Sequence, residues 1–180
     1  MPKFVRQGDN TLIGNNTFTG TNTYSGTENI TGSFQLGGVA VNATAAEINQ
    51  VADESANVEN VTATNVITAA ESGKTFFLNA VGGFTSTLPA VAAGLRFRFI
   101  VKTAPTTAYI ITTNGGSNLL YGHMLERAGT AGVAGAAQDT FNFVANNAII
   151  GDWVEFYSDG TNWYYHGMVD VAVGNTVSVA

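Results

Sequence analysis

A six-residue spacing of glycine runs through the first forty residues and restricts how that segment can fold. Glycine occurs at every sixth position from residue 8 to residue 38, and an apolar residue lies two places before five of these glycines. Because six is an even number, all of these residues point to the same side of an extended strand. The period does not fit an α-helix. The spacing therefore predicts an extended β arm, either β-solenoid-like or intertwined with strands of other chains.

The apolar positions and the glycines of the repeat are the candidate contact residues of this arm. They are Leu12, Phe18, Tyr24, Ile30 and Leu36, with Gly14, Gly20, Gly26 and Gly32. Burying five such side chains contributes about 10 kcal/mol in total. Ordering about 30 residues of backbone costs roughly 1–2 kcal/mol per residue, so the arm cannot become ordered alone. We expect residues 1–40 to lie against their own domain, another copy or a foreign surface. A Thr/Asn/Gly linker with accidental periodicity is the alternative.

Residues 41–60 are predicted to form a short helical connector. Thr44 is a suitable N-cap, and Glu47 three residues later completes a capping box. Ile48 and Val51 follow at helical spacing, and we expect this apolar stripe to pack against another element. The helix should end between residues 53 and 57.

Residues 61–180 contain the signals of a β-domain. Short runs rich in β-branched and aromatic residues recur, among them KTFFLNAV, FTSTLPAV, LRFRFIVKTA, AYIITTNGG, DTFNFVANNAII and TVSVA. In LRFRFIVK, Phe97, Phe99 and Val101 alternate with basic residues, which predicts one buried face. WVEFYSDGTNWYYHG is typical of a hairpin. AGTAGVAGAAQ, residues 128–138, is predicted to be a loop. We therefore expect a mainly β protein whose C-terminal domain is an antiparallel β-sandwich of jelly-roll type.

Composition narrows the classes of function. The chain of 180 residues has a net charge of −6, and its seven basic residues are scattered, which argues against nucleic-acid binding. No run is long enough to span a membrane, so we expect no membrane partner. The sequence has no cysteine, which excludes disulfides and thiolate chemistry.

Residues able to support catalysis are few. His123 and His166 lie in strand-like segments, where a structural role is the usual one. Asp152, Glu155 and Asp159 lie within one hairpin, and a carboxylate pair for glycoside hydrolysis has no second acidic segment to complete it. We find no metal-ligand spacing, phosphate loop or nucleophile elbow. We therefore expect no enzyme activity, no metal and no cofactor.

Several segments carry a resemblance to a known group of proteins. FTGTNTYSGT, VNATAAEIN, LPAVAAGLRFRFIV and FYSDGTNWYYHG resemble segments of virion proteins of tailed bacteriophages, in particular trimeric fibre-like and capsid-decoration proteins. The resemblance covers most of the chain. It implies a homotrimer on the outer surface of the capsid, with the major capsid protein as its partner and no catalysis.

Three functions remain open from the sequence. The first is a decoration, or cement, protein that stabilises the capsid through buried surface. The second is a short tail or head fibre that binds host glycans, with Trp163, Tyr164 and Tyr165 as a stacking platform. These aromatic residues could instead pack inside the sandwich or at a trimer interface. The third, and least favoured, is a glycan depolymerase.

Overall fold

The computed structural model describes residues 35–36, 39–44, 47–48, 54–114, 118–127 and 134–179. The chain divides into two compact units, Met1–Ala43 and Thr44–Ala180. In the first unit, β1 (Gln35–Leu36) pairs with the antiparallel strand β2 (Val39–Ala40). The other contact residues proposed for the arm lie outside the described residues, so that interpretation stays a prediction.

The capping box at the start of the connector is confirmed. The backbone N–H of Glu47 donates to Thr44 Oγ1 at 3.2 Å, and the N–H of Thr44 donates to Glu47 Oε2 at 2.7 Å. Residues 49–53, where the helix was predicted to continue, lie outside the described residues, and Glu54–Asn57 form the 3-10 turn η1. The letters TAAE recur at residues 68–71, and Thr68 and Glu71 form a second box at the 3-10 turn η2 (Ala69–Glu71).

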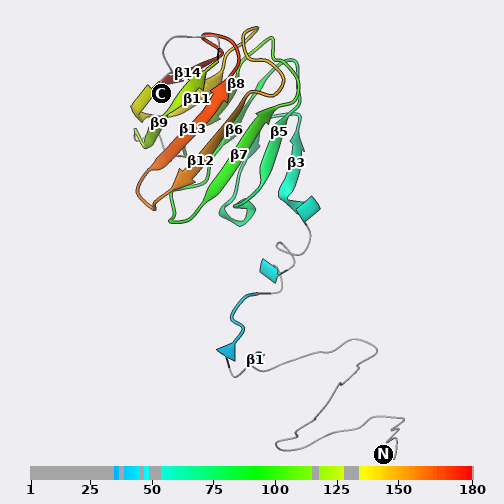
Figure 1. The fold of residues 1–180 in the computed structure, drawn as a ribbon, viewed down its shortest axis with the longest axis vertical. Helices are drawn as coiled ribbons and strands as arrows, with labels where there is room; N and C mark the ends of the chain where they lie inside the picture. The colour runs from blue at the N-terminus through cyan, green and yellow to red at the C-terminus, as the bar shows by residue number, and fades with distance from the viewer. Residues whose placement is uncertain are drawn as a thin grey trace, which may run out of the picture. The chain divides into compact units, whose positions relative to one another are not determined.

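The second unit is mainly β and contains two mixed sheets (Figure 1). The seven-stranded sheet has the order β10 (Ala134–Gln138), β9 (Leu120–Glu126), β13 (Trp163–Val169), β12 (Trp153–Ser158), β7 (Arg96–Val101), β5 (Thr75–Leu78) and β3 (Val58–Val61). The five-stranded sheet has the order β14 (Asn175–Ser178), β11 (Thr140–Phe143), β8 (Tyr109–Thr112), β6 (Phe84–Thr87) and β4 (Asn65–Val66).

The prediction of an antiparallel domain is wrong for eight of the twelve strands from β3 to β14, because each of the eight has a parallel neighbour. From β3 to β8 the chain alternates between the two sheets, and each new strand lies parallel to the previous strand of its sheet. This winding is the arrangement of a β-solenoid, which the sequence predicted only for the arm. The remaining strands are mostly antiparallel, except that β13 pairs with β9 in parallel. A strand's local pattern reports burial and not the direction of its neighbour, which explains the error.

The core lies between the sheets and is rich in aromatic rings. The expected alternation in β7 is confirmed, because Phe97, Phe99 and Val101 are fully buried. Phe156 of β12 contacts Phe99 within its own sheet and Phe141 of the five-stranded sheet, with both pairs of rings near perpendicular. These edge-to-face contacts, one within a sheet and one between the sheets, add to the hydrophobic effect of burial.

Residues 128–138 were predicted to be a loop, and the prediction is wrong for their second half. Ala134–Gln138 form β10, which pairs antiparallel with β9 at one edge of the sheet. The register shifts between Gly135 and Gln138, as at a β-bulge. Small residues carry little strand signal, so here the pairing with β9 selects the strand conformation.

Candidate functional site

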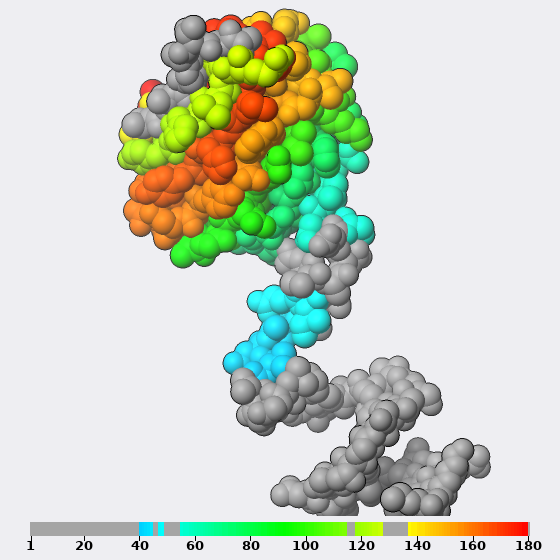
Figure 2. Space-filling model, viewed as in Figure 1, coloured from blue at the N-terminus to red at the C-terminus, as the bar shows by residue number. Residues whose placement is uncertain are grey.

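The outer face of the seven-stranded sheet is the most distinctive surface of the domain. Figure 2 views the molecule onto this face, with β9, β13, β12 and β7 side by side. The outward side chains of neighbouring strands are in register, so they form three rows across the sheet. The apolar row contains Phe77, Ile100, Trp153, Met168 and Leu125. The polar row contains Arg98, Glu155, His166 and His123. The tyrosine row contains Arg96, Tyr157, Tyr164 and Tyr121.

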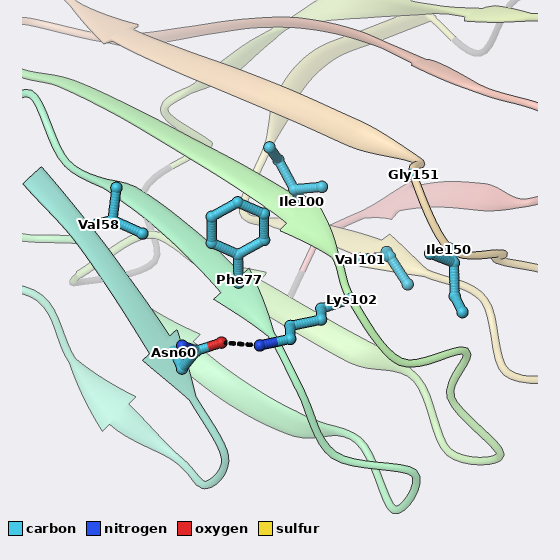
Figure 3. Close-up of a pocket in the computed structure, with 8 residues that line it drawn as sticks. All are labelled: Val58, Asn60, Phe77, Ile100, Val101, Lys102, Ile150 and Gly151. Carbon is cyan, nitrogen blue, oxygen red and sulfur yellow. Dashed lines mark hydrogen bonds between the residues drawn. The ribbon is translucent and has the colours of Figure 1, made fainter. Parts of the chain in front are cut away.

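The apolar row leaves large side chains in contact with solvent. Leu125 is 65% exposed and Met168 is 41% exposed. Beyond Ile100 the row leads to a groove of ≈ 310 Å³, whose apolar lining includes Val58, Phe77 and Ile150 (Figure 3). A contiguous apolar surface of this kind marks an interaction site more often than scattered exposed residues do.

At one end of the groove the lining becomes polar. Lys102 Nζ donates a hydrogen bond of 2.6 Å to Asn60 Oδ1, as Figure 3 shows. This bond holds the cationic group of Lys102 beside the apolar lining. A partner that fills the groove would therefore meet an apolar floor and one positive charge.

The polar row is a chain of contacts between polar and charged side chains. Glu155 lies 3.6 Å from Arg98 Nη1 and 3.5 Å from His166 Nε2. The guanidinium of Arg98 also lies 4.6 Å from the centre of the Trp153 ring, in a cation–π contact. Partly exposed pairs contribute only about 0–1 kcal/mol each, so the row orients side chains more than it stabilises the fold.

The tyrosine row holds its rings in fixed positions. Tyr157 Oη donates to Glu155 Oε2 at 2.7 Å. This hydrogen bond raises the pKa of Tyr157 above its ordinary value, and partial burial of the side chain raises it further by a smaller amount. Tyr164 Oη donates to Asp159 Oδ2 at 3.1 Å. The ring of Tyr157 also stacks on His166, with centroids 5.6 Å apart and planes 6° from parallel.

The outer face of the five-stranded sheet differs sharply from these rows. Its β8, β11 and β14 present Thr112, Thr140 and Ser178 in register. The hydroxyls of Thr140 and Ser178 lie 2.6 Å apart and share a hydrogen bond. This part of the face is rich in hydroxyl groups and suited to water, and Val66 at the β4 edge is the large apolar side chain exposed on it.

The sequence left two roles open for the hairpin aromatics, a stacking platform or packing inside the domain, and their burial separates the two. Trp163 and Tyr165 are 0% and 2% exposed and pack in the core, while Tyr164 between them is 44% exposed. Alternation along β13 places only Tyr164 on the outer face. Tyr121 and Tyr157 were not predicted as site residues, although the alternation of WVEFYS places Tyr157 on the same side as Glu155.

The acidic residues of the hairpin also separate. Asp152 is buried, and its carboxylate accepts hydrogen bonds of 2.9 Å from the backbone N–H groups of Ile149 and Asp170. Glu155 lies on the outer face with the histidines. Asp159 holds the β12–β13 turn, because its carboxylate accepts hydrogen bonds from the backbone N–H groups of Thr161 and Asn162. The bond from Asn162 is the largest of the effects that lower the pKa of Asp159. The structure therefore does not bring Asp152 and Glu155 together as a carboxylate pair.

Replacing Asp152 with asparagine is expected to lower the free energy of unfolding by about 1–3 kcal/mol at neutral pH. The amide would point an NH₂ group at one of the two backbone N–H donors and leave that donor unsatisfied. Urea unfolding of the two proteins measures the difference.

The same pair of proteins tests a pH dependence. Burial raises the pKa of Asp152 above its ordinary value of 3.8, although two backbone hydrogen bonds act in the other direction. A raised native pKa means that the folded state binds the proton more readily, so this group's contribution to stability falls as pH rises through the native pKa. The advantage of the wild type over Asp152→Asn should therefore grow as pH is lowered from 7 toward 3.8. A constant or shrinking advantage contradicts the assignment.

Comparison with known proteins gives no family for this chain. It matches no protein-family model, and no curated protein is significantly similar to it in sequence. Within the part of the chain that the structure describes, no group of three or more His, Cys, Asp or Glu side chains is placed to hold a metal ion. Among the same residues, no helix has the length and apolar character to cross a membrane.

Proposed function

We propose that the chain is a non-catalytic structural protein of a tailed-phage virion, a homotrimer that decorates and stabilises the outer surface of the capsid. The observation that carries the proposal is the apolar row with its groove, an exposed apolar surface across one face of the domain. Such a surface is stable in water when another protein covers it. The sequence resemblance to decoration and fibre-like proteins supports the same class.

Charge complementarity favours a second copy of the chain as the protein that covers this face. Two basic side chains border the apolar row, Arg98 beside Trp153 and Lys102 at the groove, and Glu155 is the acid in contact with Arg98. The row therefore has a small excess of positive charge at its margin, in a chain with a net charge of −6. In a cyclic trimer this row meets a different surface of the next copy, so its positive margin can meet acidic side chains there.

The hexad arm has a separate role in this proposal. Its apolar positions cannot stabilise an ordered arm alone, so we assign it to the contact with the major capsid protein or to winding around the other arms. We do not favour the glycan depolymerase, because Asp152 is buried just before β12 whereas Glu155 lies on the outer face, so the two do not form a carboxylate pair.

The mass of the protein in solution tests the trimer and its interface together. We expect the full-length wild type to have three times the monomer mass of 18.8 kDa in light scattering. The double variant Leu125→Glu/Met168→Glu should be a folded monomer, because two charges would have to be buried in the interface. Both residues are exposed in the single chain, so the fold should tolerate the change.

Val66→Glu is the matched control. Val66 is 68% exposed, about as much as Leu125, but it lies on the outer face of the five-stranded sheet. This variant should remain a trimer. A monomeric wild type would refute the trimer, and a trimeric double variant would exclude the apolar row as its interface.

A further inference from the structure

A second hollow lies at the end of the tyrosine row, away from the apolar row. It has a volume of ≈ 290 Å³, and its lining includes Arg96, Tyr157, Ser72 and Ser158. Small-molecule sites occupy roughly 300–1,000 Å³. This hollow of ≈ 290 Å³ lies just below that range, so it suits a single compact ring. Its lining combines one cation, one aromatic ring and hydroxyl groups, unlike the apolar groove.

The guanidinium of Arg96 is available to a ligand. Arg96 is exposed, and within the described part of the chain no carboxylate forms an ion pair with it. The nearest acid along the sheet, Glu155, is already in contact with Arg98, Tyr157 and His166. The planar fork of arginine binds a carboxylate through two parallel hydrogen bonds, so Arg96 is suited to an anionic ligand with that geometry.

The tyrosine rings offer a platform beside this cation. Tyr157 lines the hollow, and in register across the next two strands follow Tyr164 and Tyr121, whose ring centroids are 6.2 Å apart. The hydroxyls of Tyr157 and Tyr164 are held by Glu155 and Asp159. Because these side chains are already fixed, a ligand that stacks on them loses little additional conformational entropy.

Sugar rings match this combination of groups. One face of a pyranose ring presents C–H groups, which stack on an exposed aromatic ring, while its hydroxyls form hydrogen bonds with serine hydroxyls and carboxylates. A neutral sugar would leave the charge of Arg96 unused. A sugar that carries a carboxylate uses both the ring and the guanidinium.

We propose that this hollow binds an acidic monosaccharide unit of a glycan, with its ring against Tyr157 and its carboxylate on Arg96, while the glycan continues over Tyr164 and Tyr121. The site is separate from the apolar row and does not depend on the trimer. It also differs from the platform that the sequence indicated, since Trp163 and Tyr165 take no part.

A glycan array with the full-length protein tests the proposal. The probes are oligosaccharides that end in N-acetylneuraminic acid or glucuronic acid, printed beside their neutral counterparts. We expect binding to acidic oligosaccharides and at least tenfold weaker binding to the neutral ones. Titration calorimetry with the best acidic oligosaccharide then gives the affinity of each variant.

Two variants assign the roles within the site. Arg96→Gln should weaken the binding of the acidic oligosaccharide at least tenfold, so that it binds no more tightly than its neutral counterpart. Tyr157→Ala should weaken the binding of the acidic and of the neutral oligosaccharide. Arg127→Gln, a change at another exposed arginine at the end of β9, should leave affinity unchanged. Circular dichroism checks that each variant is folded.

The proposal is overturned if no acidic oligosaccharide binds at millimolar concentration, or if Arg96→Gln binds like the wild type while folded. A competition experiment distinguishes a site for acidic sugars from a site for any anion. If inorganic phosphate displaces the oligosaccharide as effectively as free glucuronic acid does, the site is a general anion site and the glycan assignment is wrong.

Discussion

Replacing Trp163 with alanine is expected to lower the free energy of unfolding of the domain by about 3–5 kcal/mol. The side chain has no solvent exposure, and its ring centroid lies 5.8 Å from that of Phe97 in the core. Removing the indole leaves a large cavity that the surrounding strands cannot close. Urea unfolding followed by circular dichroism measures the change.

The neighbouring residue provides the control. Tyr164→Ala should change stability by about 1 kcal/mol or less, because the ring is 44% exposed and its hydroxyl bond to Asp159 lies at the surface. The contrast between adjacent residues tests the register of β13. Equal losses for the two variants, or a larger loss for Tyr164→Ala, would mean that the strand presents the opposite face to the core.

Replacing Gly167 with alanine is expected to destabilise the domain by an amount at or above the upper end of the roughly 1–3 kcal/mol found for overpacked cores. A Cβ atom at this position would lie 2.2 Å from the carbonyl oxygen of Trp153 and 2.8 Å from the Cα of Val154. Both atoms belong to the backbone of β12, which is held between β13 and β7 and cannot move away. The β13–β12 pairing would have to open.

Gly82→Ala is the corresponding control, because a Cβ atom there meets nothing within 4 Å. Its effect should stay within about 0.5 kcal/mol, as at most surface positions. Thermal unfolding of both variants makes the comparison. If Gly167→Ala is as stable as Gly82→Ala, then β12 and β13 are not as close as the structure places them.

Local patterns in the sequence predict the strands that contain aromatic residues, but not how the strands are paired. The alternation in β7 and the hairpin of β12 and β13 were predicted correctly, because large apolar residues mark their buried faces. The strand β9 was predicted only as a strand-like segment around His123, since Gly122 and His123 interrupt its pattern, and β10 consists mostly of small residues. The parallel winding of β3–β8 depends on contacts between distant segments, which no local window contains.

The candidate site was predicted only in part, for a related reason. Trp163, Tyr164 and Tyr165 are adjacent in the sequence, but side chains alternate along a strand, so the platform hypothesis holds only for Tyr164 and the alternative, packing inside the sandwich, holds for Trp163 and Tyr165. Because Glu155 pairs with His166 on the outer face, Trp163 and Tyr165 must point inward. Arg96 and Tyr121 reach the same face from other strands, so their contribution requires the sheet order.

Immunogold electron microscopy of purified virus particles tests the central claim most directly. An antibody raised against residues 58–179 would be applied to particles of the phage to which our proposal assigns this protein, and gold labels would be counted by location. Our proposal predicts dense labelling over the whole head. A few labels at the tail or at one vertex would identify a fibre or spike instead, and a complete absence of label on accessible particles would contradict a role on the virion surface.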